Sequence, residues 1–384
     1  MKSLHYYKKR AGISLKKILR IIMAVFIMVN LTSCKGEKTN EEGQESKESK
    51  ESFDINIATN ILNTYMGYMY SGDIERAKDL YSEKISEKGI EPYPTDLKIL
   101  SYKTDEVNEV GRSGVFKVKV VRGAADKVIS VLDNYNIKIE LNDKEYKLTE
   151  IGSNTEKEAF LEGEGIRLKD KNSVKNNLIV DMSGIPYYAF PKNDGSMINK
   201  APVPRKSFGM MAFSYNGERI AVSTKDENSS YLGIIQIDET GASQGGAAAG
   251  GGGTGDGGGE GGGGGSSLII KEPPVGKDIT SLDIIKDGNI ETMAFSLEEK
   301  VIMAQYKIKG KGTSLRVYDV ESGELVDFKF EEKFPIDKVD VVFSSFDKDV
   351  LNFEVKEKEA TGKDGSEMLG KWQLDLKEFE VKKL

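Results

Sequence analysis

The feature that most restricts the fold of this chain is a short block that recurs at a nearly regular interval. The sequence Met-Ala-Phe-Ser occupies residues 211–214 and again residues 293–296, and weaker copies occupy residues 158–161 and 341–344. Successive Phe positions in the four copies are 53, 82 and 48 residues apart. The long interval contains a glycine-rich insertion of about 30 residues, so the underlying period is roughly 50 residues. Such a period predicts a series of similar small units packed side by side.

Each unit of the repeat reads as a meander of short strands. In the second unit residues 219–223 are expected to pair with residues 232–237, and in the third residues 301–305 with residues 315–318. This strand–turn pattern resembles the blades of a β-propeller over residues 158–384. Four units make the smallest ring that closes. An open, twisted sheet built from the same hairpins is the alternative, and the resemblance implies no particular activity.

The chain before the repeats has a different period. Apolar residues recur at steps of three and four from Asp54 to Met69, and Asp73 is placed to cap a second helix after the break at Ser71-Gly72. Beyond Pro94 the period drops to two, which predicts strands as far as residue 151. The expected fold class is therefore an α+β domain at residues 53–152, with two helices on a curved antiparallel sheet.

This first region resembles the cystatin-like cone fold of the nuclear-transport-factor-2 superfamily. The resemblance is carried by residues 70–77 (Tyr-Ser-Gly-Asp-Ile-Glu-Arg-Ala) and by the closing hairpin at residues 144–148. That family includes enzymes, ligand binders and many extracytoplasmic lipoproteins. Its catalytic members often use an Asp-His pair, which this chain does not supply.

The first 34 residues have the pattern of a lipoprotein signal. Seven basic residues and no acid precede or flank a short apolar run at residues 21–29, which is too short to span a bilayer. Leu31-Thr32-Ser33-Cys34 follows and resembles the bacterial lipobox. The resemblance implies cleavage of residues 1–33 between Ser33 and Cys34, and a diacylglycerol and palmitate anchor on Cys34. Two acyl chains bind a membrane firmly at about 0.8 kcal/mol per buried methylene.

The predicted mature chain is strongly acidic. Removing the leader takes away 7 of the 55 basic residues and none of the 62 acidic ones, which leaves a net charge near −14. Residues 34–52 contain no large apolar side chain, so we expect a disordered tether there. The charge argues against nucleic acid as a partner. The expected location is the extracytoplasmic face of the bacterial cell membrane, with the lipid on Cys34 as the contact.

Two residue types that often carry catalysis are missing from the mature chain. The only His is His5 in the leader, and the only Cys is Cys34. Their absence excludes Ser-His-Asp and Cys-His catalysis, His-based zinc sites and disulfides within the mature chain. We therefore predict no catalytic residue, no metal ligand and no cofactor, and a chain that is not an enzyme.

The glycine-rich tract within residues 241–267 does not match a nucleotide-binding loop. A P-loop ends in Lys followed by Ser or Thr, and the tract contains no Lys. A dinucleotide-binding turn needs a following helix, whereas strands are expected on both sides here. The tract is therefore predicted to be a disordered loop at the outer hairpin of one unit.

Three groups of residues are candidates for sites. Tyr65, Met69 and Phe116 are the predicted walls of a ligand pocket in the cone fold, although core packing explains the same pattern. The Asp residues that begin the turn of each repeat are predicted to bond the backbone of that turn rather than calcium. These are Asp181, Asp238, Asp319 and Asp375. The spacing of Glu162 and Glu164 would suit acid–base catalysis but also arises by chance in so acidic a chain.

Three functions follow as hypotheses. The first is a non-enzymatic binding or scaffold lipoprotein whose partner is an envelope protein or glycan. The second is a carboxylate-dependent hydrolase of envelope glycans, which needs a cleft with two acids. The third is a sensor that binds a small ligand in the cone pocket.

Overall fold

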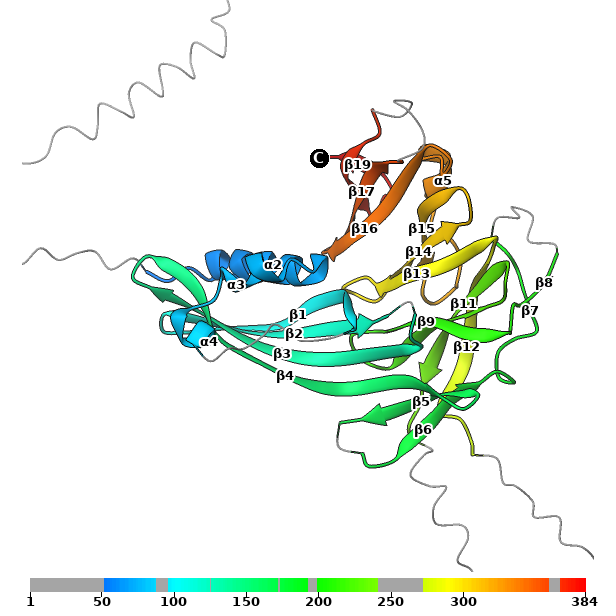
Figure 1. Ribbon diagram of the computed structural model, residues 1–384, viewed down its shortest axis with the longest axis horizontal. Coiled ribbons are helices and arrows are strands. Elements are labelled where there is room, and N and C mark those ends of the chain that lie inside the picture. The colour runs from blue at the N-terminus through cyan, green and yellow to red at the C-terminus, as the bar shows by residue number, and fades with distance from the viewer. Residues whose placement is uncertain are drawn as a thin grey trace, which may run out of the picture. The chain divides into compact units, whose positions relative to one another are not determined.

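Six strands and three helices form the first part of the described chain (Figure 1). The structure is a computed structural model that describes residues 52–87, 96–124, 126–171, 173–192, 199–240, 272–358 and 367–384. The predicted signal peptide, Cys34, almost all of the tether and the glycine-rich tract lie outside these residues. Within the described ranges, no helix is both long and apolar enough to cross a membrane.

Local capping explains where the first helices begin and end. Helix α2 (Ile55–Ser71) starts after Asp54, whose side chain accepts a hydrogen bond from the Asn56 N–H. It ends at Gly72, which adopts the left-handed conformation (φ 75°) that glycine reaches without steric cost. Asp73 then caps helix α3 (Ile74–Lys78) through the Arg76 N–H. A further short helix, α4, spans Glu83–Glu87.

The helices pack on a six-stranded antiparallel sheet whose strands follow one another in sequence order. The strands are β1 (Lys98–Val110), β2 (Ser113–Gly123), β3 (Ile129–Asn142), β4 (Glu145–Glu162), β5 (Gly165–Asp170) and β6 (Asn176–Asp181). Leu62 and Tyr65 of α2 share a buried apolar cluster with Phe116 of β2 and Ile137 of β3. This packing of helices on one face hides the apolar side of the sheet.

Strands β3 and β4 are long enough to take part in two different cores. Tyr135 and Ile137 of β3 lie in the helix-covered cluster, whereas Leu132 of the same strand joins a second cluster with Ala159 of β4 and Phe213. The Phe213 N–H also donates to the Ser130 hydroxyl, at 3.3 Å. The two predicted domains are therefore connected by continuous strands.

The predicted boundary between them needs correction for this reason. Residues 152–157 are predicted to join the two domains, but they lie within β4. The weak first repeat at residues 158–161 belongs to the same strand and so to the six-stranded sheet. The sequence pattern does not reveal this boundary, because polar and apolar residues keep alternating where a strand passes from one core to another.

Three further antiparallel sheets correspond to the later repeats. The first contains β9 (Ser207–Phe213), β10 (Arg219–Lys225), β11 (Ser229–Ile237) and β12 (Gly276–Lys286). The second contains β13 (Gly288–Phe295), β14 (Val301–Ile308) and β15 (Gly312–Asp319). The third contains β16 (Val339–Asp347), β17 (Val350–Glu357), β18 (Gly370–Asp375) and β19 (Val381–Lys383). A short ribbon of β7 (Tyr188–Ala189) and β8 (Ala201–Pro202) precedes them, and helix α5 (Phe330–Lys333) lies between β15 and β16.

The verbatim repeat marks the same hairpin in two of these sheets. Ser214 follows β9, and its hydroxyl accepts a hydrogen bond from the Arg219 N–H at 3.1 Å. Ser296 follows β13, and its hydroxyl accepts from the Val301 N–H at 3.2 Å. The structure is thus mostly β, and three repeats of strand meanders are present as separate sheets.

Candidate functional site

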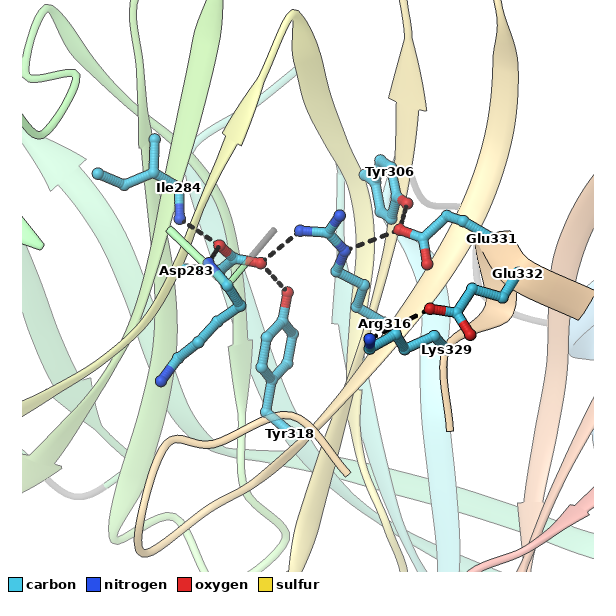
Figure 2. A network of polar contacts seen from close by, with 9 residues as sticks. Asp283, Ile284, Tyr306, Arg316, Tyr318, Lys329, Glu331 and Glu332 are labelled. Atoms are coloured by element: carbon cyan, nitrogen blue, oxygen red, sulfur yellow. Dashed lines mark hydrogen bonds and ion pairs between the residues drawn. The ribbon is translucent and has the colours of Figure 1, made fainter. Parts of the chain in front are cut away.

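A cavity of about 300 Å³ lies beside strand β15 and helix α5. Leu315, Leu325 and Phe328 provide apolar walls, and Lys192, Arg316 and Glu331 provide charged groups. A concave site with apolar walls and a few converging polar groups is the usual form of a ligand site. The polar groups at this cavity are continuous with a buried network (Figure 2).

Asp283 of β12 anchors this network. Its side chain has no exposed surface. One carboxylate oxygen accepts hydrogen bonds from the backbone N–H groups of Lys192 and Ile284, at 2.8 and 2.7 Å. The other oxygen accepts from Arg316 Nη1 at 2.6 Å and from the Tyr318 hydroxyl at 2.8 Å. Four donors satisfy the carboxylate, so its orientation is fixed.

The Arg316 guanidinium is held from two sides and borders the cavity. Nη1 donates to Asp283, and Nε donates to Glu331 Oε1 at 2.9 Å (Figure 2). The Tyr306 ring lies 5.3 Å from the guanidinium carbon, and its hydroxyl donates to the same Glu331 oxygen. Within the described part of the chain, Nη2 of Arg316 has no hydrogen-bond partner. The guanidinium thus offers unused donors in a fixed position.

Burial and charge set the protonation states of this network. Burial raises the pKa of Tyr318 well above its ordinary value, and the nearby Asp283 carboxylate raises it further. Burial likewise raises the pKa of Tyr306, with Glu331 adding to the effect. Burial opposes the charge of Arg316, but Tyr318, Asp283 and Glu331 outweigh it and the pKa is raised. Both hydroxyls therefore remain donors, and the guanidinium remains charged.

The other cations at the cavity are also paired. Lys192 Nζ lies 2.7 Å from Glu324, and Lys329 Nζ lies 3.1 Å from Glu332. With Asp283 and Glu331 beside Arg316, four carboxylates pair with three cations, which leaves one negative charge. The cavity is therefore close to neutral, although charged side chains line it.

The three predicted pocket residues do not line one cavity. Tyr65 and Phe116 have no exposed surface and fill the helix-covered core. Met69 borders a separate cavity of about 300 Å³ next to Arg122 and Tyr135. Helical spacing identified the buried face of α2 correctly but did not separate core positions from cavity walls.

The repeated Asp residues act in turns, as predicted. Each carboxylate accepts a hydrogen bond from backbone N–H groups two or three residues later. The acceptors and donors are Asp181 with Ser183 and Gly184, Asp238 with Thr240, Asp319 with Glu321 and Ser322, and Asp375 with Lys377 and Glu378. Each carboxylate therefore stabilises its own turn.

Glu162 and Glu164 lie at the exposed turn between β4 and β5. Glu162 forms an ion pair with Arg167 Nε at 3.3 Å. Neither residue borders the cavities described here. Their spacing in sequence thus reflects a hairpin and not a pair facing across a cleft.

Sequence reasoning missed the network residues, although one signal was present. Asp283 interrupts the apolar run Leu282, Ile284 and Ile285 in the middle of a strand. An acid at such a position is buried only with partners, so it marks a polar site. Arg316 and Glu331 gave no comparable signal, because their partners come from other elements.

Comparisons with known proteins give weak likenesses. No family model matches the sequence, and no curated protein matches it. Among solved structures, a puromycin hydrolase mutant is 10% identical over 72% of this chain and 46% of that chain, with a TM-score of 0.29. The match spans less than half the length of that hydrolase.

Two other solved structures are of propeller or TolB proteins. The β-propeller domain of the Trilobed protease from Pyrococcus furiosus is 11% identical over 74% of this chain and 84% of that chain, with a TM-score of 0.27. TolB from Acinetobacter baumannii is 8% identical over 82% of this chain and 83% of that chain, with a TM-score of 0.20.

The prediction that the chain is not an enzyme does not stand, and two of the similar solved structures are of a hydrolase and of the propeller domain of a protease. The prediction rested on the missing imidazole and thiol, but Ser, Thr, Lys and carboxylate side chains also serve as nucleophiles. The absence of an imidazole and a thiol therefore does not exclude catalysis. The TM-scores are too low for the likeness to assign an activity or a substrate to this chain.

Proposed function

We propose that this chain is a lipid-anchored protein of the bacterial cell envelope, and that its β-sheets form a scaffold for binding a ligand beside Arg316. The observation that carries the binding role is the guanidinium itself. Asp283 and Glu331 fix it at a cavity with apolar walls, while Nη2 keeps unused donors among the described residues. Rigid placement of a donor lowers the entropic cost of binding.

The anchor in this proposal is the lipid on Cys34. Cleavage after Ser33 would leave the diacylglyceryl cysteine at the new N-terminus, and residues 35–52 would link it to α2. Labelled palmitate should enter the wild-type protein but not a Cys34→Ser variant, and the variant should leave the membrane fraction. Label in the variant, or an unchanged distribution between membrane and soluble fractions, would remove the anchor from the proposal.

The binding role is tested by changing the cavity wall without touching the network. Leu325→Glu places a charge at the cavity wall. Val174→Glu introduces the same charge at a residue that is fully exposed, and so serves as the control. Envelope components that cross-link to the wild type and to Val174→Glu should be lost from Leu325→Glu. Equal recovery by all three proteins would contradict binding at this cavity.

A second candidate function is supported by another cavity of about 410 Å³. Asp226, Asp287 and Glu291 border it together with Lys307. Converging acids are what a carboxylate-dependent glycan hydrolase requires. The full chain should release sugars from cell-wall polysaccharide, and the release should be reduced in Glu291→Gln but not in Glu164→Gln. No release by the wild type would contradict this function.

A further inference from the structure

We infer that the cavity beside Arg316 binds an uncharged, peptide-like ligand, with the C=O and N–H of one of its residues bonded to Arg316 and Glu331. The inference rests on the proposed binding role of this cavity and names the chemical class of its ligand. Three observations lead to it: the pairing of the charges, the positions of the unused donors and acceptor, and the apolar walls.

The pairing of charges disfavours an anion. A ligand carboxylate on Arg316 would lie near Asp283 and Glu331, which already neutralise the guanidinium at 2.6 and 2.9 Å. Asp283 cannot turn away, because it is fully buried and accepts four hydrogen bonds. Like charges repel strongly where water is excluded. A neutral acceptor gains the same hydrogen bond without this repulsion.

The unused polar atoms of the site complement an amide. Nη2 of Arg316 can donate to a carbonyl oxygen. Glu331 accepts both of its hydrogen bonds, from Arg316 and Tyr306, at Oε1, so Oε2 has no partner among the described residues. This oxygen can accept from an N–H group. A donor and an acceptor on these two paired side chains match the C=O and N–H of one residue of an extended peptide, because these two groups point to the same side.

The walls specify the rest of the ligand. Leu325 and Phe328 are only partly buried and border the cavity together with Leu315. The Phe328 ring is held by an edge contact with Phe330, with ring centroids 4.9 Å apart. A volume of about 300 Å³ is at the small end for ligand sites, so the cavity suits one or two residues with an apolar side chain.

The test compares two probes that differ in one group. N-acetyl-leucine methylamide is neutral and carries two amides, whereas N-acetyl-leucine is a carboxylate at pH 7. Binding of each to the full chain in detergent micelles is measured by ligand-observed NMR titration. The methylamide should bind at least about tenfold more tightly, because only the carboxylate meets repulsion from Asp283 and Glu331.

Variants locate the binding and separate the two proposals. Arg316→Lys should weaken methylamide binding, with Arg112→Lys, at an exposed hairpin, as the matched control. If Arg316→Lys does not fold, as judged by its thermal transition, Leu325→Glu against Val174→Glu gives the same comparison. Equal or tighter binding of the carboxylate, lost in the cavity variants, would overturn the ligand class and leave the binding site intact. If neither probe binds the wild type, or if the cavity variants bind both unchanged, the site itself and this inference fail together.

Discussion

The helix-covered end of the six-stranded sheet and the sheet of β13–β15 both bury large aromatic side chains, but they do so in different ways. Tyr65 and Phe116 lie among apolar neighbours in the first region. Tyr306 and Tyr318 are equally buried in the second, yet their hydroxyls donate to carboxylates. These two aromatic side chains of the first region pack in an apolar cluster, whereas those of the second region also depend on satisfied charges.

The difference explains why a search for aromatic residues misses the candidate site. An aromatic stripe on a helix packs into a core because burial of its surface is favourable by itself. A buried carboxylate such as Asp283 is stable only with several donors, so it requires partners from other parts of the chain. The buried carboxylate of Asp283, and not an aromatic group, therefore marks the candidate site.

The largest effect should come from removing the central charge. Asp283→Ala leaves the Arg316 guanidinium without one of its two carboxylate partners and three other donors without an acceptor. Breaking one half of a buried ion pair costs about 4 kcal/mol. The free energy of unfolding, measured by urea denaturation, should fall by this amount.

Two comparisons sharpen that result. Asp283→Asn keeps the size and some of the acceptors, so its loss should be smaller than that of Asp283→Ala. Asp226→Ala, at an exposed turn, should cost far less. A loss below about 1 kcal/mol for Asp283→Ala would show that the network is not held by charge pairing.

The helix-covered core should respond next most strongly. Phe116 has no exposed surface, so Phe116→Ala should create a cavity and lower the free energy of unfolding by about 3 kcal/mol. Because no charge is involved, the loss should not change with salt. Exposed Val110 provides a control, since Val110→Ala should have little effect. A Phe116→Ala variant as stable as the wild type would mean that Phe116 borders open space, as the alternative prediction of a pocket wall requires.

Much of the local structure could be predicted from the sequence. Asp54 and Asp73 have the side chains that cap helices, and Gly72 has the freedom that a helix end needs. Identical blocks ending in Ser214 and Ser296 fold into identical hairpins, because the hydroxyl bonds the same backbone position in each. These features depend on contacts between residues close together in sequence.

The features that could not be predicted depend on distant contacts. Residues 158–161 read as another repeat but extend a strand of the first sheet, because pairing with β3 and β5 decides where they belong. The candidate site brings together Asp283 of β12, Arg316 of β15 and Glu331 of α5. No local pattern joins these three elements, so neither the pairing nor the cavity is visible in the sequence.

The smallest effect separates a surface carboxylate from the buried one. Asp319 also accepts backbone hydrogen bonds, from Glu321 and Ser322, but it does so in a turn near solvent. Asp319→Ala should therefore cost only about 1 kcal/mol at pH 7, and Asp319→Asn, which keeps the acceptor oxygen, should cost less. Both losses are measured by urea denaturation.

The pH dependence of that cost tests its origin. Hydrogen bonds from the Ser322 backbone lower the pKa of Asp319 below its ordinary value of 3.8, despite the opposing effect of burial. The folded state therefore favours the ionised form, and the stabilisation is complete above about pH 4 and is lost as pH falls through the lowered pKa. The difference between the wild type and Asp319→Ala should shrink over that range. If the difference in the free energy of unfolding stays constant or grows toward pH 2, the ionised carboxylate does not stabilise the turn. The contrast between Asp319 and Asp283 would then be one of packing and not of charge.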